Sequence, residues 1–499
     1  MRKKELYKVH RLLSFIIGIP VFLWAVSGLV HPLMTSVRPH INTQAAPLDS
    51  LTPLEVAHFQ SLRTICMQHG IHRFYKTRLI NINRNWYYQV QTSADTIPVY
   101  INANDGMLLA KGDQVYATML ARHFLGDSVA MSLSDPVQRL TGFTKDYKYV
   151  NRLLPVYRVE FNREDSIAIY VDTQESRFSF AEDKHRNGFN RFFAFFHTWS
   201  WLDNYPKSKA GIIAGILCLA LFTTAIGLYI AFTTNGKKKK GHRLLKARRL
   251  HRITALVAAF FVVSWAFSGT LHALVNSLPE ARGFVIDSAK MDINTLPADL
   301  HQKTLSLVEA DNRPVLDMAY LSIAGEPALR VQYDPVKHQP KQDLMKEMRV
   351  TAPRSSYIRL SDWTPITDGD KRAAIYLARK QLKGVAGEAN WKAPKISYLT
   401  SFNEVYNFSD KVLPVWEVSP DGTIGHTVFI DTQSGRLTKK ASRLDQADAL
   451  CFAFFHKHEF MAWAGKSAKD ASTIIGVLLV ITMLVFGYRL FYISRRKKK

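Results

Sequence analysis

The amino-acid sequence predicts a membrane α-helical protein with four transmembrane helices, an internal duplication, and α+β domains outside the membrane. Three observations predict this fold class: long apolar stretches, basic residues beside them, and sequence blocks that recur in the same order in both halves. A helix needs about 20 predominantly apolar residues to cross the hydrocarbon core of a bilayer. Four stretches meet this requirement, at residues 12–30, 210–232, 253–275 and 473–493.

The formal net charge of +25 could suggest a nucleic-acid partner, but the positions of the basic residues argue against one. They cluster at the N-terminus, in a central run at 237–252 and at 495–499, and each cluster adjoins an apolar stretch. This is the positive-inside pattern of a membrane protein. We therefore expect a lipid bilayer as partner, no nucleic acid, both termini in the cytoplasm, and the two long intervening segments on the outer side.

Two histidines bracket both the first and the third apolar stretch. The first pair is His10 and His31, the second is His251 and His272, and the histidines of each pair are 21 residues apart. Both stretches end in the pattern W-A-x-S-G-x-x-H. Because the internal copy cannot be a cleaved signal peptide, we expect the first stretch to be a retained helix as well.

Three further blocks recur in the same order. Residues 154–160 match 413–418, residues 170–177 match 429–436, and the aromatic segment 193–197, ending in His197, matches 452–456, ending in His456. The chain is thus two copies of one plan: helix, outer domain, aromatic segment with a histidine, helix. Such parallel repeats are related by an axis along the membrane normal.

The outer segments have the alternating apolar pattern of strands. Strands are predicted near 86–91, 99–102, 157–161, 167–171, 415–418 and 427–430, and helices near 53–68, 115–124 and 371–382. A weaker counterpart of the early unit is expected at about 299–340 in the second copy. The aromatic segments 189–202 and 450–463 are expected to form amphipathic helices at the membrane interface.

These patterns divide the chain into seven expected segments. They are a first transmembrane helix (1–35), a first outer region (36–188), an interfacial segment with the second helix (189–235), a basic cytoplasmic loop (236–249), a third helix (250–276), a second outer region (277–449), and an interfacial segment with the fourth helix and basic tail (450–499).

A helix and two strands that end in the turn D-T-x-x-G, as at 431–435, resemble a PepSY domain. The K-x-H-R sequence at 8–11 and the duplicated four-helix plan resemble the PepSY-associated transmembrane family over nearly the whole chain. The resemblance implies a bacterial inner-membrane protein with periplasmic PepSY-like domains. It also implies b-type haem on histidines of the membrane helices, in the manner of ferric-siderophore reductases. The first copy has Glu175 and Ser176 where a glycine is expected, which predicts a weakened turn there.

Six histidines that recur across the duplication are the candidate axial ligands of haem iron: His10, His31, His197, His251, His272 and His456. Haem iron accepts axial imidazole, and its flat ring needs small residues nearby. Gly28 and Gly269 each lie three residues before a histidine, on the same helical face, and are predicted to make room for the ring.

The interval of 21 residues corresponds to about 31 Å along a helix, so each helix presents a histidine to both sides of the bilayer. We expect His10 to meet His251 near the cytoplasmic surface, and the other four histidines to cluster near the outer surface. Two or more haem b groups are implied. The pairing within the outer cluster, and whether it holds one haem or two, stay open.

Simpler interpretations compete with this one. A single histidine at a membrane boundary usually points to the interface or caps a helix; only the repetition in register favours haem. Trp24, Trp199, Trp201, Trp265 and Trp463 could pack on porphyrin, although an interfacial aromatic belt is the commoner explanation. His458 and the pair His69 and His72 are expected at the surface.

No motif of another enzyme class is present: the sequence lacks H-E-x-x-H, G-x-S-x-G, a Walker loop and a dinucleotide fingerprint. No catalytic residue is assigned, and a separate electron donor is implied. The function expected is that of a haem-b membrane oxidoreductase that passes electrons to an extracytoplasmic ferric acceptor such as a ferric siderophore, in iron acquisition. The alternative is a non-enzymatic, membrane-anchored protein that binds or senses a periplasmic peptide, protease or envelope component.

Overall fold

A computed structural model describes residues 3–36, 38–47, 49–126, 132–148, 151–234, 243–277, 289–310, 314–333, 354–383, 386–387, 391–420 and 426–496. The chain divides into two compact units. The helical unit comprises Met1–Arg38, Lys184–Glu280 and Arg443–Lys499, and the sheet unit comprises Pro39–Asp183 and Ala281–Ser442. The sheet unit is therefore one body built from both halves of the chain.

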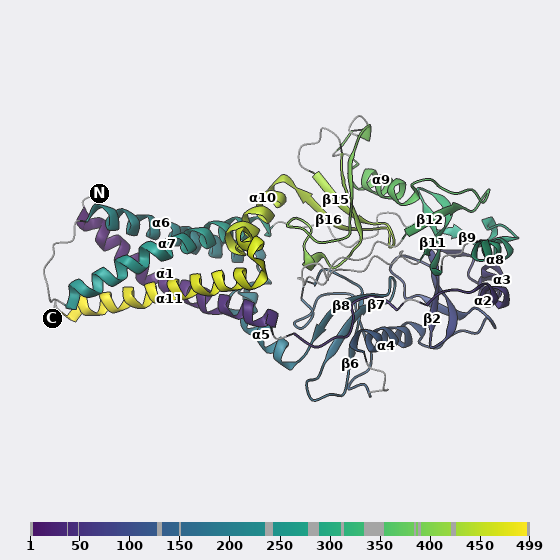
Figure 1. Cartoon of the computed structure of the whole chain (residues 1–499), viewed down its shortest axis with the longest axis horizontal. Helices are drawn as coiled ribbons and strands as arrows, with labels where there is room; N and C mark the ends of the chain where they lie inside the picture. Colours follow the sequence, from purple (N-terminus) through teal and green to yellow (C-terminus); the bar gives the residue numbers. More distant parts are fainter. Residues whose placement is uncertain are drawn as a thin grey trace. The chain divides into compact units, whose positions relative to one another are not determined.

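Four long helices make up most of the helical unit: α1 (Lys3–Ser36), α6 (Pro206–Thr233), α7 (Arg243–Val275) and α11 (Gly465–Arg496). Each is long and apolar enough to cross a membrane, which confirms the length and composition predicted for the four stretches. They run alongside one another as a bundle, and the start of α1 and the end of α11 lie at the same end of it (Figure 1).

Two shorter segments pack on the bundle, α5 (Lys184–Phe196) against α1 and α10 (Arg443–Cys451) against α7. These helices begin at Lys184 and Arg443, earlier than the predicted starts at 189 and 450. Neither predicted interfacial segment, 189–202 or 450–463, is one continuous helix. The backbone turns into the left-handed region at Trp199 (φ 50°) and at His458 (φ 56°) before short 3-10 turns at Ser200–Leu202 and Glu459–Ala464. The break occurs at matching positions in both halves.

A six-stranded antiparallel sheet joins the two halves of the sheet unit, in the order β12-β11-β10-β2-β3-β4. Its strands are β2 (Lys76–Ile82), β3 (Asn85–Gln91), β4 (Val99–Asn102), β10 (Val315–Ile323), β11 (Glu326–Tyr333) and β12 (Arg354–Arg359). The halves meet where β2 pairs with β10, with Arg78 opposite Ala319. The weak early unit of the second copy is thus present as α8 (Leu300–Ala310), β10 and β11, while its end at 334–340 lies outside the described residues.

Each half also contributes a four-stranded sheet. The first has β5 (Gln138–Leu140), β6 (Val156–Glu160), β7 (Ala168–Asp172) and β8 (Arg177–Glu182), and the second has β13 (Lys395–Leu399), β14 (Val415–Ser419), β15 (His426–Asp431) and β16 (Arg436–Ser442). The four strands predicted here are confirmed. The predicted helix at 53–68 is two helices, α2 (Pro53–His58) and α3 (Leu62–Gln68), because Ser61 caps a new N-terminus.

The duplication is visible in how α4 (Gly112–Leu125) and α9 (Gly369–Gln381) begin. The Tyr100 hydroxyl donates to Asp113 Oδ1 at 2.6 Å, and the Tyr357 hydroxyl donates to Asp370 Oδ1 at 2.6 Å. Each helix starts with a glycine, where a Cβ would lie 2.7 Å from the Cβ of that tyrosine. The strand before each helix can therefore pack directly on its first turn.

The turn at Glu175 and Ser176 has the same backbone geometry as its counterpart in the second half, although it lacks the glycine. Ser176 adopts φ 58°, close to the φ 66° of Gly435 at the matching position. The Ser176 hydroxyl is hydrogen-bonded to Tyr116 Oη at 2.6 Å and accepts from Arg78 at 3.3 Å. These side-chain bonds stabilise a backbone conformation that usually favours glycine.

Candidate functional site

The inner pair of candidate ligands lies between helices of the same half. His10 of α1 has its Nδ1 3.1 Å from the Thr223 carbonyl oxygen of α6, and His251 of α7 has its Nδ1 3.2 Å from the Met483 carbonyl oxygen of α11. A carbonyl oxygen can only accept, so Nδ1–H is the donor in both. His251 lies close enough to His10 for the two imidazoles to interact electrostatically.

Two glycines that the sequence analysis missed make room for these rings. A Cβ on Gly227 would lie 2.9 Å from His10 Cε1, and a Cβ on Gly487 would lie 3.2 Å from His251 Cε1. Both distances are shorter than ordinary carbon–carbon contact. Each glycine occurs late in the second helix of its half, a recurrence that could have identified them.

The predicted glycines face other groups. A Cβ on Gly28 would lie 3.9 Å from His197 Cε1, and a Cβ on Gly269 would lie 3.1 Å from Leu217 Cδ1. Neither would come within 4 Å of the histidine three residues later. Gly28 thus adjoins a candidate ligand from another segment, and Gly269 serves the packing of α7 on α6.

The outer candidates form a cluster. The rings of His197 and His456, one from each half, have centres 6.3 Å apart and planes at 79°. His31 lies within electrostatic reach of His197, and His272 within reach of His456. The two halves of the chain therefore bring their outer histidines together.

The serine of the W-A-x-S-G-x-x-H pattern orients these rings. Ser27 Oγ donates to the Leu23 carbonyl oxygen at 2.7 Å, and Ser268 Oγ donates to that of Ser264 at 2.7 Å. A hydroxyl has one proton, so each Oγ accepts from the histidine. The distances are 3.1 Å to His197 Nδ1 and 3.3 Å to His456 Nδ1.

His272 has a different kind of partner. Its Nδ1 lies 2.9 Å from Asp448 Oδ2, and its ring stacks on Phe452 with centres 4.0 Å apart. His31 lies beside the matching Phe193, with ring centres 6.1 Å apart.

Three of the five tryptophans, Trp24, Trp199 and Trp265, make stacking contacts within the helical unit. Trp24 stacks on Trp199 with ring centres 5.2 Å apart, and its Nε1 donates to the His197 carbonyl oxygen. At the matching place Trp265 stacks on His458, with centres 5.6 Å apart. His458 is fully buried, so its predicted surface position is wrong. The left-handed backbone at residues 199 and 458 places the rings of Trp199 and His458 at equivalent positions in the two halves.

Trp201 and Trp463 are exposed, as interfacial side chains would be.

These contacts fit axial ligation of haem. Five of the six histidines use Nδ1–H as a donor, which leaves Nε2 unprotonated, and metal-binding histidines are typically held in this way. His197 and His456 would be the pair to hold the iron, because their ring centres lie 6.3 Å apart and each comes from a different half. Burial lowers the pKa of His197 to about 4, which keeps its imidazole neutral. Among the described residues no three His, Cys, Asp or Glu side chains converge to hold a bare metal ion, whereas axial ligation needs only two.

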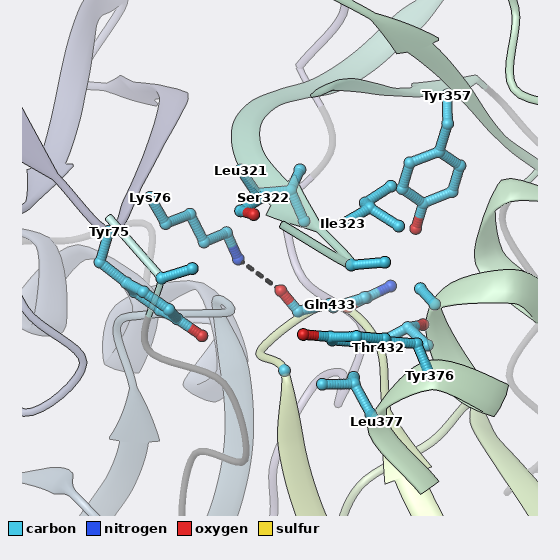
Figure 2. Close-up of a pocket in the computed structure, with 14 residues that line it drawn as sticks. Tyr75, Lys76, Leu321, Ser322, Ile323, Tyr357, Tyr376, Leu377, Thr432 and Gln433 are labelled. Atoms are coloured by element: carbon cyan, nitrogen blue, oxygen red, sulfur yellow. Dashed lines mark hydrogen bonds between the residues drawn. The ribbon is translucent and has the colours of Figure 1, made fainter. Parts of the chain in front are cut away.

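The sheet unit contains a hollow lined by Tyr75, Lys76, Leu321, Tyr357, Tyr376 and Gln433, among others (Figure 2). Lys76 Nζ donates to Glu175 Oε1 at 2.5 Å and to the Gln433 carbonyl oxygen at 2.8 Å. Burial alone would raise the pKa of Glu175, but the Lys76 and Arg78 cations outweigh it and hold the pKa at about 2. The lysine beside this hollow is therefore compensated by a buried carboxylate.

Buried ion pairs also connect the two halves of the sheet unit. Asp317 of β10 accepts from Arg78 of β2 at 3.3 Å and from Arg330 of β11 at 2.9 Å. Arg177 donates to both carboxylate oxygens of Asp431, at 2.7 and 3.1 Å. Removal of one partner from such a pair leaves an uncompensated buried charge, so these contacts make the joining of the halves specific.

A comparison of the chain with protein-family models finds none that matches, and a comparison with curated proteins finds no match either. The interpretation of the site therefore depends on its geometry.

Proposed function

We propose that the protein is a haem-b oxidoreductase of the bacterial inner membrane. It would pass electrons to a ferric acceptor on the outer side, and the acceptor we propose is a ferric siderophore. The observation that carries this proposal is the pair His197 and His456. Their rings come from different halves, lie 6.3 Å apart, and each offers Nε2 because Nδ1–H is bonded to a serine.

The symmetry of the duplication pairs the remaining candidates in the same way. His10 would be matched with His251 at the inner level, and His31 with His272 at the outer level. The 21 residues between the two levels correspond to about 31 Å of helix, enough to cover the hydrocarbon thickness of a bilayer. The ligands would thus be arranged at both faces of the membrane.

Bound haem supplies a one-electron Fe(III)/Fe(II) couple. The chain's own residues would hold the imidazoles of His197 and His456 in fixed orientations through Ser27 and Ser268. In the overall reaction a separate donor on the inner side loses one electron, and one ferric ion of the acceptor becomes ferrous. Because ferrous iron is held weakly by ligands selected for ferric iron, the reduction would help to release the metal.

Reduced-minus-oxidised absorption spectra of the purified full-length chain in detergent test the proposal. We expect a b-type band in the wild type. The variants H197A and H456A should lose the same fraction of it, because each removes one ligand of the same iron. The matched control is H58A, which alters an exposed histidine of the sheet unit. A wild type without a b-type band would contradict the proposal and favour the non-enzymatic binding or sensing function.

A further inference from the structure

We infer that Asp448 strengthens His272 as an electron donor to the iron that it would hold, and thereby lowers the reduction potential of that iron relative to the others. The inference rests on the proposed function, because Asp448 acts through a candidate axial ligand. Asp448 is therefore a positioning residue, which contacts the ligand and not the acceptor.

The contact is direct. Asp448 Oδ2 lies 2.9 Å from His272 Nδ1, the carboxylate side chain is 7% exposed, and the imidazole side chain is 42% exposed. Asn276 Nδ2 donates to the His272 carbonyl oxygen at 2.9 Å and to the same Oδ2 at 3.3 Å, and it lies 3.0 Å from His272 Nδ1. Asp448 Oδ1 is buried without a hydrogen-bond partner in the described part of the chain. In the described part of the chain, the His272 imidazole at 2.9 Å and the Asn276 amide at 3.3 Å therefore contact the carboxylate through Oδ2.

The charged partner distinguishes His272 from four of the other candidates. The Nδ1 acceptors of His10 and His251 are backbone carbonyls, and those of His197 and His456 are hydroxyls, so all four are neutral. In the first half, the residue that matches Asp448 is Phe189, which cannot accept the proton. The duplication thus preserves the histidine and changes its partner.

The local helix also differs between the halves. The first half continues as an α-helix through Phe196, whereas in the second half α10 gives way to a π-helical turn at Phe452–His456. Such turns are rare and are frequently found at functional sites. This π-helical turn directly follows α10, which carries Asp448, and it ends at the candidate ligand His456.

A carboxylate that accepts Nδ1–H gives the imidazole partial negative character and makes Nε2 more basic. A more electron-rich axial ligand stabilises ferric over ferrous iron, and second-shell hydrogen bonding is one of the means by which proteins set haem potentials. The iron held by His272 should therefore have a lower potential than one held through neutral acceptors alone, which would favour electron flow away from it.

Spectroelectrochemical titration of the full-length protein tests the inference. In D448N, which removes the charge and keeps the size, we expect one midpoint potential to rise while the others stay at their wild-type values. D448E, which keeps the charge, should remain near the wild type. D203N is the matched control, because it removes a negative charge from the same unit at an exposed carboxylate bonded to Lys209.

Loss of one haem in D448N with its retention in D448E would also support the inference, since removal of such a partner typically weakens metal affinity about 10- to 100-fold. Unchanged midpoints in D448N, an equal shift in D203N, or loss of haem in both D448 variants would overturn it. A wild type without b-type haem would defeat the proposed function itself, which is a distinct result from unmoved potentials in a haem-containing protein.

Discussion

Gly227 of α6 lies directly against the imidazole of His10 of α1, where a Cβ would come within 2.9 Å of Cε1. The same relationship joins Gly487 of α11 to His251 of α7, at 3.2 Å. In each half the second helix therefore approaches the inner histidine at a position that only glycine leaves open, while a carbonyl one turn earlier accepts the proton of its Nδ1.

The first prediction concerns these glycines. We expect G227A and G487A to displace the ring, break its bond to the carbonyl, and destabilise the protein by about 1–3 kcal/mol, as overpacking does. Thermal unfolding in detergent and the b-type band measure both effects. G211A and G215A are controls on α6, where a Cβ would meet nothing within 4 Å. Equal effects in the controls and the G227A variant would contradict the prediction.

The second prediction concerns the serines behind the outer histidines. S27A and S268A remove the acceptor of Nδ1–H from His197 and His456, so the rings lose their fixed orientation. We expect haem affinity to fall about 10- to 100-fold, measured by retention of haem on dilution or by titration of the stripped protein. T224A is the control, because Thr224 Oγ1 bonds only the Ala220 carbonyl among the described contacts. Retention of haem at the wild-type level in both serine variants would contradict this prediction.

The third prediction concerns the ion pairs that join the halves of the sheet unit. D317N leaves Arg78 and Arg330 buried with a weaker partner. Breaking a buried pair typically costs about 3–5 kcal/mol, which chemical denaturation of the full-length protein should detect. E326Q, which alters an exposed pair with Arg359, should give no measurable change. A D317N protein as stable as the wild type would contradict this role.

The fourth prediction is a dependence of stability on pH. The pKa of Glu175 is about 2 in the folded chain against an ordinary value of 4.5, and the pKa of Asp317 is also lowered because Arg78 and Arg330 outweigh its burial. Both carboxylates therefore stabilise the fold above about pH 4.5, and this contribution is lost as the pH falls from there towards 2.

Near-ultraviolet circular dichroism between pH 7 and pH 3 should show this loss. A variant that carries both K76M and E175Q lacks one buried pair and should lose less stability on acidification than the wild type. The same slope in the two proteins would show that Glu175 is not responsible.

The spans and most strands of this protein were predictable because they depend on local patterns. Period-two apolar alternation predicted the strands beginning at Val156, Ala168, Val415 and His426. The recurring histidines were also visible, because the duplication aligns them. His458 was misplaced because its burial depends on a left-handed turn and on Trp265, which lies far away in the sequence.

By itself, the sequence determined four helices long and apolar enough to cross a membrane, a duplicated plan, and the identity of six candidate ligands, because hydrophobic length and repeated spacing are properties of the chain alone. Only the tertiary structure decided the partners of those histidines, the glycines that admit them, and the pairing of β2 with β10 that joins the two halves of the sheet unit. The physical reason is that a hydrogen bond or a close contact depends on where separate elements meet, and no local pattern specifies that.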